Sequence, residues 1–229
     1  MSIEQALTAI RARIAKAEIA AGRPPGSVTL LAVSKTREAA DLRAALAAGQ
    51  HRFGESYVQE ALDKIAALAE AEVEWHFIGP LQSNKSRQVA EHFHWCHSVD
   101  RLKLARRLSA QRPAGLPPLQ ICLQVNISGE ASKSGFAPDA VCAAAAEIAG
   151  LPNLVLRGLM AIPARERDYN RQRAAFARLR ELRDVLNAER ALSLDTLSMG
   201  MTGDLEAAIA EGATLVRVGT GIFGSRTRD

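Results

Sequence analysis

The stretch Val28-Thr29-Leu30-Leu31-Ala32-Val33-Ser34-Lys35 decides how this chain is interpreted. Its apolar run is typical of a strand buried on both faces, as in a parallel α/β sheet. Lys35 then stands at the C-terminal tip of the strand, where such proteins place their sites. An amine in a low-dielectric site is neutral more readily and can condense with an aldehyde to a Schiff base. The alternative, on this residue alone, is a lysine that ends a strand and reaches water.

Short apolar segments alternate with longer amphipathic ones along the rest of the chain. A helix is predicted over Ile3 to Ala20. Strands are predicted near Leu30, Arg52, Phe77, Cys96, Ile121, Leu156, Leu197 and Val216. Helices are predicted between them at 39–48, 57–69, 85–91, 102–110, 138–149, 170–188 and 205–211.

This alternation predicts parallel strands joined by right-handed crossovers. Eight such units in about 200 residues favour the α/β class, as a single (β/α)8 TIM-type barrel with an extra N-terminal helix. We expect one domain over residues 1–229. An open doubly wound sheet is the competing fold, but no G-x-G-x-x-G turn follows the first strand.

Composition limits the classes of protein that the chain can belong to. It has 229 residues, of which 48% are hydrophobic and 24% charged, as in ordinary soluble globular proteins. There is no apolar run of about 18 residues and no signal segment, so we expect a cytoplasmic protein that does not enter membranes. Cys96, Cys122 and Cys142 form no C-x-x-C pair, and we expect reduced core residues.

The net charge of +4 does not indicate nucleic-acid binding. The densest basic segment, 165–190, interleaves acidic residues and carries an apolar stripe at helical spacing. That pattern is typical of a solvated helix face, and a nucleic-acid surface would need clustered charge with stacking aromatic residues. We therefore expect no nucleic-acid partner.

A histidine-rich segment raises the question of a metal site. His92, His94 and Cys96 alternate and would share one strand face, with His97 on the other side. Three ligands on one strand rarely converge on one ion, so we predict an ordinary hydrogen-bonded strand and no metal.

Two glycine-rich loops follow the last two predicted strands. The first is Ser198-Met199-Gly200-Met201-Thr202-Gly203-Asp204, and the second is Arg217-Val218-Gly219-Thr220-Gly221. Each combines hydroxyl groups with glycines that let backbone N–H groups approach an anion. Barrels bind phosphate after strands seven and eight, so the sequence predicts a phosphate site here.

Lys35 and this phosphate site are neighbours in a closed barrel, because the eighth strand pairs with the first. A molecule carrying both an aldehyde and a phosphate would fit them, and pyridoxal 5′-phosphate (PLP) is such a molecule. Arg217, alternating inward from the last strand, could then reach the ring nitrogen of PLP.

At this point the chain resembles the pyridoxal phosphate homeostasis proteins, single-domain relatives of the alanine racemase N-terminal barrel. The resemblance rests on separated motifs in one order: AVSKT (32–36), FGESYVQE (53–60), WHFIGPLQSNK (75–85), QVNISGEASKSGF (124–136), RGLMAIP (157–163), LSMGMTGDLEAAI (197–209) and VRVGTGIFGSR (216–226).

The resemblance implies a role for each of five residues in PLP binding. Lys35 would form the Schiff base. Ser198, Gly219 and Thr220 would hold the phosphate, and Arg217 would face the pyridine nitrogen. The chain departs from the family pattern at two positions, since Ser56 stands where Asn is usual and Thr202 where Ser is usual.

The resemblance also implies a carrier or regulator of PLP, and not an enzyme with robust turnover. A cationic arginine at the ring nitrogen makes the ring a poorer electron sink. Racemases of this type use a second base, a tyrosine from an added domain, whereas the tyrosines here are Tyr57 and Tyr169. We therefore expect slow or absent inversion of amino acids. A weak racemase or lyase is the alternative, and a cofactor-free aldolase using Lys85 or Lys133 is a third hypothesis.

The remaining expectations concern partners and secondary positions. The protein would receive PLP, pass it to apo PLP-dependent enzymes and remain a monomer. His76 and Asn126 stand near strand ends and could support the site. Lys85 and Lys133 lie in polar loops, where solvated side chains are expected.

Overall fold

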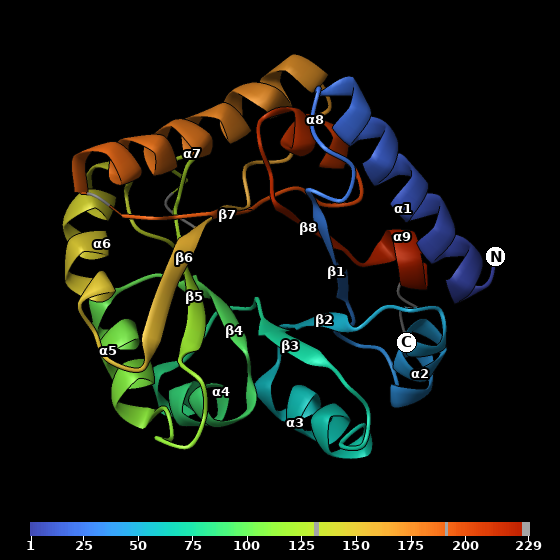
Figure 1. Ribbon diagram of the computed structural model, residues 1–229, viewed down its shortest axis with the longest axis horizontal. Helices are drawn as coiled ribbons and strands as arrows, with labels where there is room; N and C mark the ends of the chain where they lie inside the picture. Colours follow the sequence, from blue (N-terminus) through green and yellow to red (C-terminus); the bar gives the residue numbers. More distant parts are fainter. Residues whose placement is uncertain (131–132, 191, 226–229) are drawn as a thin grey trace.

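The structure is a computed structural model that describes residues 1–130, 133–190 and 192–225. Eight parallel strands form one closed barrel in chain order, and the last strand pairs with the first (Figure 1). The strands are β1 (Thr29–Val33), β2 (Arg52–Glu55), β3 (Glu74–Phe77), β4 (Trp95–Val99), β5 (Leu119–Gln124), β6 (Leu154–Met160), β7 (Thr196–Ser198) and β8 (Leu215–Val218). This confirms the predicted (β/α)8 barrel and excludes the open doubly wound sheet.

The helices alternate with the strands and surround the barrel (Figure 1). They are α1 (Ile3–Ala20), α2 (Ala39–Ala47), α3 (Val58–Ala67), α4 (Ser86–His92), α5 (Leu102–Gln111), α6 (Val141–Ala149), α7 (Tyr169–Arg190), α8 (Leu205–Ala210) and α9 (Thr220–Phe223). Short 3₁₀ turns, Ser83–Lys85 and Pro138–Ala140, precede α4 and α6. The four-residue α9 was not predicted, because so short a segment shows no helical periodicity.

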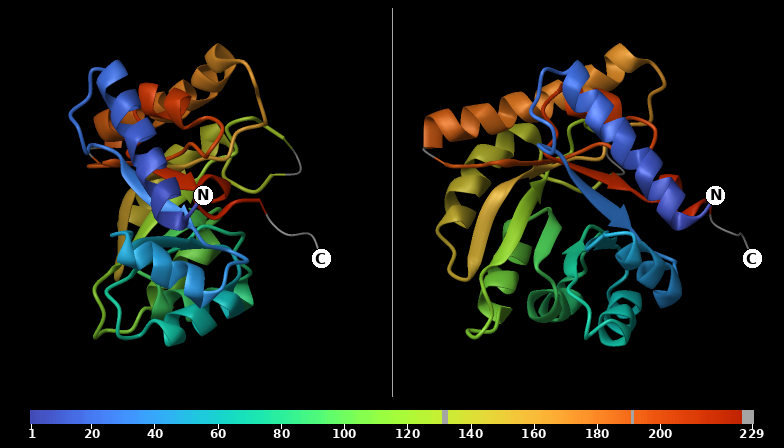
Figure 2. Two further views of the ribbon diagram at one scale, coloured as in Figure 1. Left: turned by 90° about the vertical axis from the view of Figure 1, so that its right-hand side faces the viewer. Right: turned by 45° about the vertical axis from the view of Figure 1, so that its right-hand side comes forward.

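The extra N-terminal helix begins with a reciprocal cap. The Ser2 hydroxyl accepts from the Gln5 N–H at 3.1 Å, and the Gln5 side chain accepts from the Ser2 N–H at 3.0 Å. Figure 2 shows α1 lying along the flank of the barrel, where it packs against α2, α8 and α9. At its far end the buried Glu18 accepts the Val28 N–H at 2.8 Å and so fixes the approach to β1.

The main hydrophobic cluster joins strands to helices, with Ala32 and Phe53 from the barrel and Leu42 and Phe176 from the surrounding layer. The barrel interior also holds polar side chains. His97 on β4 and Ser198 on β7 are hydrogen-bonded at 2.8 Å although their strands are not neighbours, so the contact crosses the interior. Both residues are fully buried, which requires such pairing.

Two further findings concern the described ranges. No helix in them combines the length and apolar character needed to cross a bilayer. The same ranges hold no group of three or more His, Cys, Asp or Glu side chains suited to a metal ion. Ala131 and Ser132, inside the fourth motif, and Arg226, the end of the last motif, lie outside the described residues.

Candidate functional site

Lys35 lies at the C-terminal mouth of the barrel, beside the loop that follows β8. Leu31 and Ala32 of β1 pair with Arg217 and Val218 of β8, so the residues after both strands emerge side by side. A Cβ atom on Gly219 would lie 3.3 Å from the carbonyl oxygen of Val33, which is a tight contact. Because glycine has no Cβ atom, the loop after β8 can pack closely against Val33, which lies two residues before Lys35.

The two loops predicted to bind phosphate also meet. The hydroxyls of Thr202, after β7, and Thr220, after β8, are 3.4 Å apart, and the Gly221 N–H donates to Thr202 Oγ1 at 3.3 Å. Gly200 has φ of +91°, and its carbonyl accepts the Arg217 N–H at 2.9 Å. The structure thus brings Lys35, Gly219 and Thr220 to one mouth, and it adds Thr202 to them.

The turn that carries Lys35 is fixed by a buried ion network that the sequence did not reveal. Lys64 of α3 donates to the Ser34 carbonyl at 2.7 Å, to Glu55 Oε1 at 2.8 Å and to Glu60 Oε1 at 2.5 Å. Glu60 also accepts the Thr36 N–H at 2.5 Å, where the backbone has φ of +63°. The spacing of Glu60 and Lys64 by four residues was the signal available in the sequence.

Glu55 is the most deeply buried member of that network. Its side chain is fully buried, and Oε1 accepts the Ser34 hydroxyl at 2.6 Å. Burial raises the pKa of Glu55, and the nearby Lys64 opposes this rise. Its second oxygen, Oε2, has no hydrogen-bond partner within the described ranges. The network therefore depends on the positive charge of Lys64.

Arg217 points into the barrel beneath the mouth and is only 4% exposed. Its Nη1 donates to the Ser198 carbonyl at 2.5 Å and to Ser198 Oγ at 2.7 Å, and its Nη2 donates to the Ala161 carbonyl at 2.9 Å. Burial lowers the pKa of Arg217 to about 10, and Asp204 opposes this, so the guanidinium is cationic at neutral pH. Three of its five N–H groups are thus used within the described residues.

Ser198 is the last residue of β7, and its hydroxyl faces the barrel interior. Its hydroxyl is fully buried and is engaged by His97 and Arg217. The hydroxyl that meets the β8 loop belongs to Thr202 instead. Contact between Ser198 and a phosphate therefore stays a prediction, and it would require Oγ to accept or donate in addition to these two bonds.

Four further residues were predicted to support the site or to lie in solvated loops, and the structure places each of them. His76 is buried within β3, and its Nδ1 lies 2.9 Å from Nε2 of His97. Asn126 follows β5, and its amide donates to the Glu130 carbonyl at 2.8 Å. Lys85 ends a 3₁₀ turn, and Lys133 pairs with Glu130 at 2.5 Å.

One interpretation of the histidine segment was wrong. His92 is the last residue of α4, and β4 begins only at Trp95, so His92, His94 and Cys96 do not share a strand face. The helix was predicted over 85–91 and ends one residue later, at His92, so the predicted strand face does not include this residue. Cys96 is buried and free, and burial raises its pKa to about 11, as expected for a reduced core thiol.

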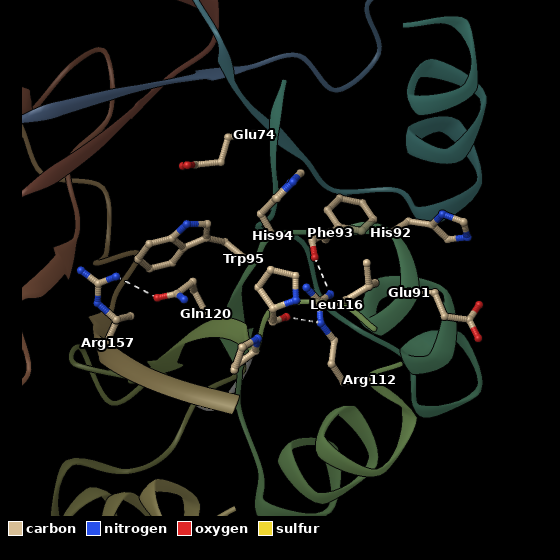
Figure 3. A pocket seen from close by; sticks show the side chains of 12 residues that line it. Glu74, Glu91, His92, Phe93, His94, Trp95, Arg112, Leu116, Gln120 and Arg157 are labelled. Carbon is tan, nitrogen blue, oxygen red and sulfur yellow. Dashed lines mark hydrogen bonds between the residues drawn. The ribbon is translucent and has the colours of Figure 1, made fainter. Parts of the chain in front are cut away.

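A separate cleft of about 460 Å³ opens at the opposite mouth, near the start of β3 to β6 (Figure 3). Glu74, Trp95 and Gln120 contribute to its lining. Arg157 lies 5.2 Å from the Trp95 ring centroid and donates to Gln120 at 2.8 Å and to Asp195 at 3.0 Å. In barrels this end serves stability, and the candidate site is at the other mouth.

The C-terminal mouth can hold a phosphorylated aldehyde. Lys35 supplies an amine, and the pairing of β1 with β8 sets it beside the Gly219–Thr220 loop. The hydroxyls of Thr202 and Thr220 are suitable donors to phosphate oxygens. Arg217 adds a buried positive charge with N–H groups left for a ring nitrogen. The residues therefore fit PLP.

Comparison with known proteins gives likenesses over the whole barrel. The profile of the family described as "Alanine racemase, N-terminal domain" matches residues 6–227. The pyridoxal phosphate homeostasis protein of Pseudomonas aeruginosa is 62% identical over 98% of this chain and 96% of its own length. The protein of that name from Escherichia coli K12 is 54% identical over 96% and 95%. The structure of PipY from Synechococcus elongatus with PLP bound has a TM-score of 0.85 and 38% identity, covering 97% of this chain and 100% of that one.

Proposed function

This chain belongs to the family of pyridoxal phosphate homeostasis proteins, and we propose that it binds PLP as a Schiff base on Lys35 and takes part in intracellular PLP homeostasis. The observation that carries the proposal is the pairing of β1 with β8, which sets Lys35 beside the Gly219–Thr220 loop. The full-length likeness to PipY, whose structure contains PLP, supports it.

Each proposed contact uses a group already described at the mouth. The Lys35 amine attacks the aldehyde carbon, a C=N bond forms and water leaves, and hydrolysis reverses the reaction. Gly219 and Thr220 hold the phosphate, with the Thr202 hydroxyl in the place predicted for Ser198, because the Ser198 hydroxyl is already bonded to His97 and Arg217. Arg217 faces the pyridine nitrogen with the N–H groups that Ser198 and Ala161 leave unused.

The proposed role is that of a carrier without robust catalytic turnover. The cationic Arg217 disfavours protonation of the ring nitrogen, so bound PLP is a weak electron sink. Because the Schiff base is reversible, the protein limits the free reactive aldehyde and releases PLP to apo PLP-dependent enzymes. We propose that it does so as a cytoplasmic monomer, with neither nucleic acid nor membrane as a partner.

A weak PLP-dependent racemase or lyase activity is the second candidate. It is favoured by one observation, since Tyr57 follows β2 at the same mouth as Lys35 and is 53% exposed. Tyr169 begins α7 and is 48% exposed. An activity toward an amino acid that is lost in both Lys35→Ala and Tyr57→Phe would support this second function.

The carrier role is tested by transfer of PLP. The loaded protein is mixed with an apo PLP-dependent enzyme, and recovery of that enzyme's activity is followed against free PLP at equal concentration. The carrier role predicts recovery with wild type and none with Lys35→Ala. Amino-acid turnover by the loaded protein alone, at rates typical of enzymes, about 1 per second or more, would contradict it.

A further inference from the structure

A buried chain of hydrogen bonds runs through the barrel from one mouth to the other. Glu74 Oε1, at the start of β3, lies 2.7 Å from His76 Nε2. His76 Nδ1 lies 2.9 Å from His97 Nε2, and His97 Nδ1 lies 2.8 Å from Ser198 Oγ. Ser198 Oγ accepts from Arg217 at 2.7 Å, which completes the chain. Its two ends carry opposite charges.

The chemistry of the partners assigns a direction to every bond. Arg217 can only donate, and the Glu74 carboxylate can only accept. Ser198 therefore donates its hydroxyl to His97 Nδ1, and each histidine donates from Nε2 and accepts at Nδ1. Burial lowers the pKa of His76 and holds that of His97 well below its ordinary value, so both rings are neutral. All dipoles of the chain thus point the same way and reinforce one another.

Trp95 covers the two imidazole rings on the side of the cleft. Its ring is stacked on His76, with centroids 5.4 Å apart and an interplanar angle of 12°, and it is tilted against His97 at 5.6 Å. The Arg157 guanidinium lies over the Trp95 ring at 5.2 Å. The rings are therefore shielded from the cleft, and only Glu74, whose side chain is 38% exposed, reaches it.

Within the described ranges, a small number of other charged or titratable groups face this chain of hydrogen bonds. At the Glu74 end these are Arg52 of β2, at 3.3 Å, His94, and Arg157 of β6. At the Arg217 end they are Asp204, ahead of α8, and Cys122 of β5. Both histidines are neutral, so Glu74 carries the charge at its end of the hydrogen-bond chain. Glu74 lies at the N-terminal mouth, and its charge can be removed by substitution there without changing a side chain of the barrel interior.

We propose that His97, held in one orientation by His76 and Glu74, is a positioning residue that acts through the Ser198 hydroxyl on Arg217. The chain holds the guanidinium at the ring end of the cofactor site and transmits the charge of Glu74 to it from the opposite mouth. This inference rests on the proposed function, since Arg217 is taken to face the PLP ring.

The histidine tautomers test the chain without any cofactor. Nitrogen-15 NMR of the unloaded protein distinguishes neutral Nε2–H, neutral Nδ1–H and cationic rings. The proposal requires that His76 and His97 are both neutral Nε2–H tautomers at pH 7. A cationic ring or an Nδ1–H tautomer at either position would overturn it, whatever the protein does with PLP.

The loaded protein tests the effect on the site. Borohydride reduction and mass mapping first verify that each variant carries PLP on Lys35, and the pH midpoint of its visible absorption band is then measured. Loss of the Glu74 charge leaves Arg217 in a more positive environment, which favours loss of a proton from the bound cofactor. Glu74→Gln should therefore move the midpoint about 0.3 to 1 pH unit lower. Glu91→Gln, on the same cleft but outside the chain, should not move it.

A double-mutant cycle distinguishes an effect transmitted through the chain of hydrogen bonds from a direct electrostatic effect of Glu74 on the cofactor site. His97→Gln interrupts the chain, so Glu74→Gln should have little further effect in that background. Ser198→Ala offers the same interruption at a small residue if His97→Gln folds poorly. Additive shifts, or variants that load PLP on Lys35 and keep the wild-type midpoint, would overturn the proposal. Absence of the visible band in wild type would instead identify the proposed function as the failure.

Discussion

Lys64 Nζ donates a 2.7 Å hydrogen bond to the carbonyl oxygen of Ser34, the residue that precedes Lys35. The same ammonium pairs with Glu55 and Glu60, and Glu60 accepts the N–H of Thr36. Both backbone neighbours of Lys35 are thus fixed by one buried ion network between β2 and α3. A reactive amine is useful at a defined position only if its backbone is held, and this network holds it.

Removal of Lys64 should be costly. Lys64→Met leaves the fully buried Glu55 carboxylate without its positive partner, and we expect a loss of about 3–5 kcal/mol in the free energy of unfolding. Urea denaturation measures this loss. Lys103→Met, at an exposed position on α5, is the matched control and should change stability by less than about 0.5 kcal/mol. Equal effects of the two substitutions would contradict the role of the network.

The buried histidines should make stability depend on pH. Their pKa values are lowered in the folded protein, so below the unfolded value of about 6.5 the unfolded chain binds more protons, and stability falls as pH falls. His97→Gln removes one such group and should reduce the slope by up to about 1.4 kcal/mol per pH unit between pH 6.5 and the folded pKa. Urea denaturation at several pH values measures the slope.

The matched control for this slope is His92→Gln. His92 is exposed at the end of α4 and lies outside the buried chain of hydrogen bonds. Its substitution should keep the wild-type slope. If His97→Gln also keeps that slope, the neutral state assigned to His97 is wrong.

The hydroxyl pair at the two phosphate loops should contribute to PLP affinity. Thr220→Val removes a donor from the proposed phosphate site, and a hydrogen bond to a charged group is typically worth about 1.5–3 kcal/mol, or roughly 10- to 150-fold in the dissociation constant. Equilibrium titration of the visible band measures this constant. Thr8→Val, on the exposed face of α1, should leave it unchanged. Unaltered affinity in Thr220→Val would remove Thr220 from the site.

Gly200 should tolerate no side chain. Its φ is +91°, and a Cβ atom would lie 2.5 Å from the Cβ of Ala208. We expect Gly200→Ala to cost about 1–3 kcal/mol through backbone strain and this overlap. Gly203→Ala in the same loop is the control, because a Cβ there meets no atom within 4 Å. Thermal unfolding of both variants tests this prediction, and equal melting temperatures would contradict it.

The architecture could be predicted because each unit carries its own signal. All eight strands lie where the apolar segments indicated, and α1 has the predicted bounds. Hydrophobic periodicity reports which face an element buries, and strict alternation leaves few topologies. The four-residue α9 was missed because it is too short to show a period.

The site could be predicted only where chain order determined proximity. Lys35 and Gly219 were placed together because the first and last strands of a barrel must pair. The interior was not predictable in this way. That His97 meets Ser198 across the barrel, and that Lys64 reaches the Ser34 carbonyl, depend on side-chain directions that strand order does not fix.

The proposed function depends most on Lys35 as the anchor of PLP. The direct measurement is borohydride reduction of the PLP-loaded protein followed by mass mapping of its peptides. We expect a yellow protein whose reduced phosphopyridoxyl group lies on Lys35, and no stable adduct in Lys35→Ala. A protein that remains colourless with added PLP, or that carries the adduct on Lys85 or Lys133, would contradict it.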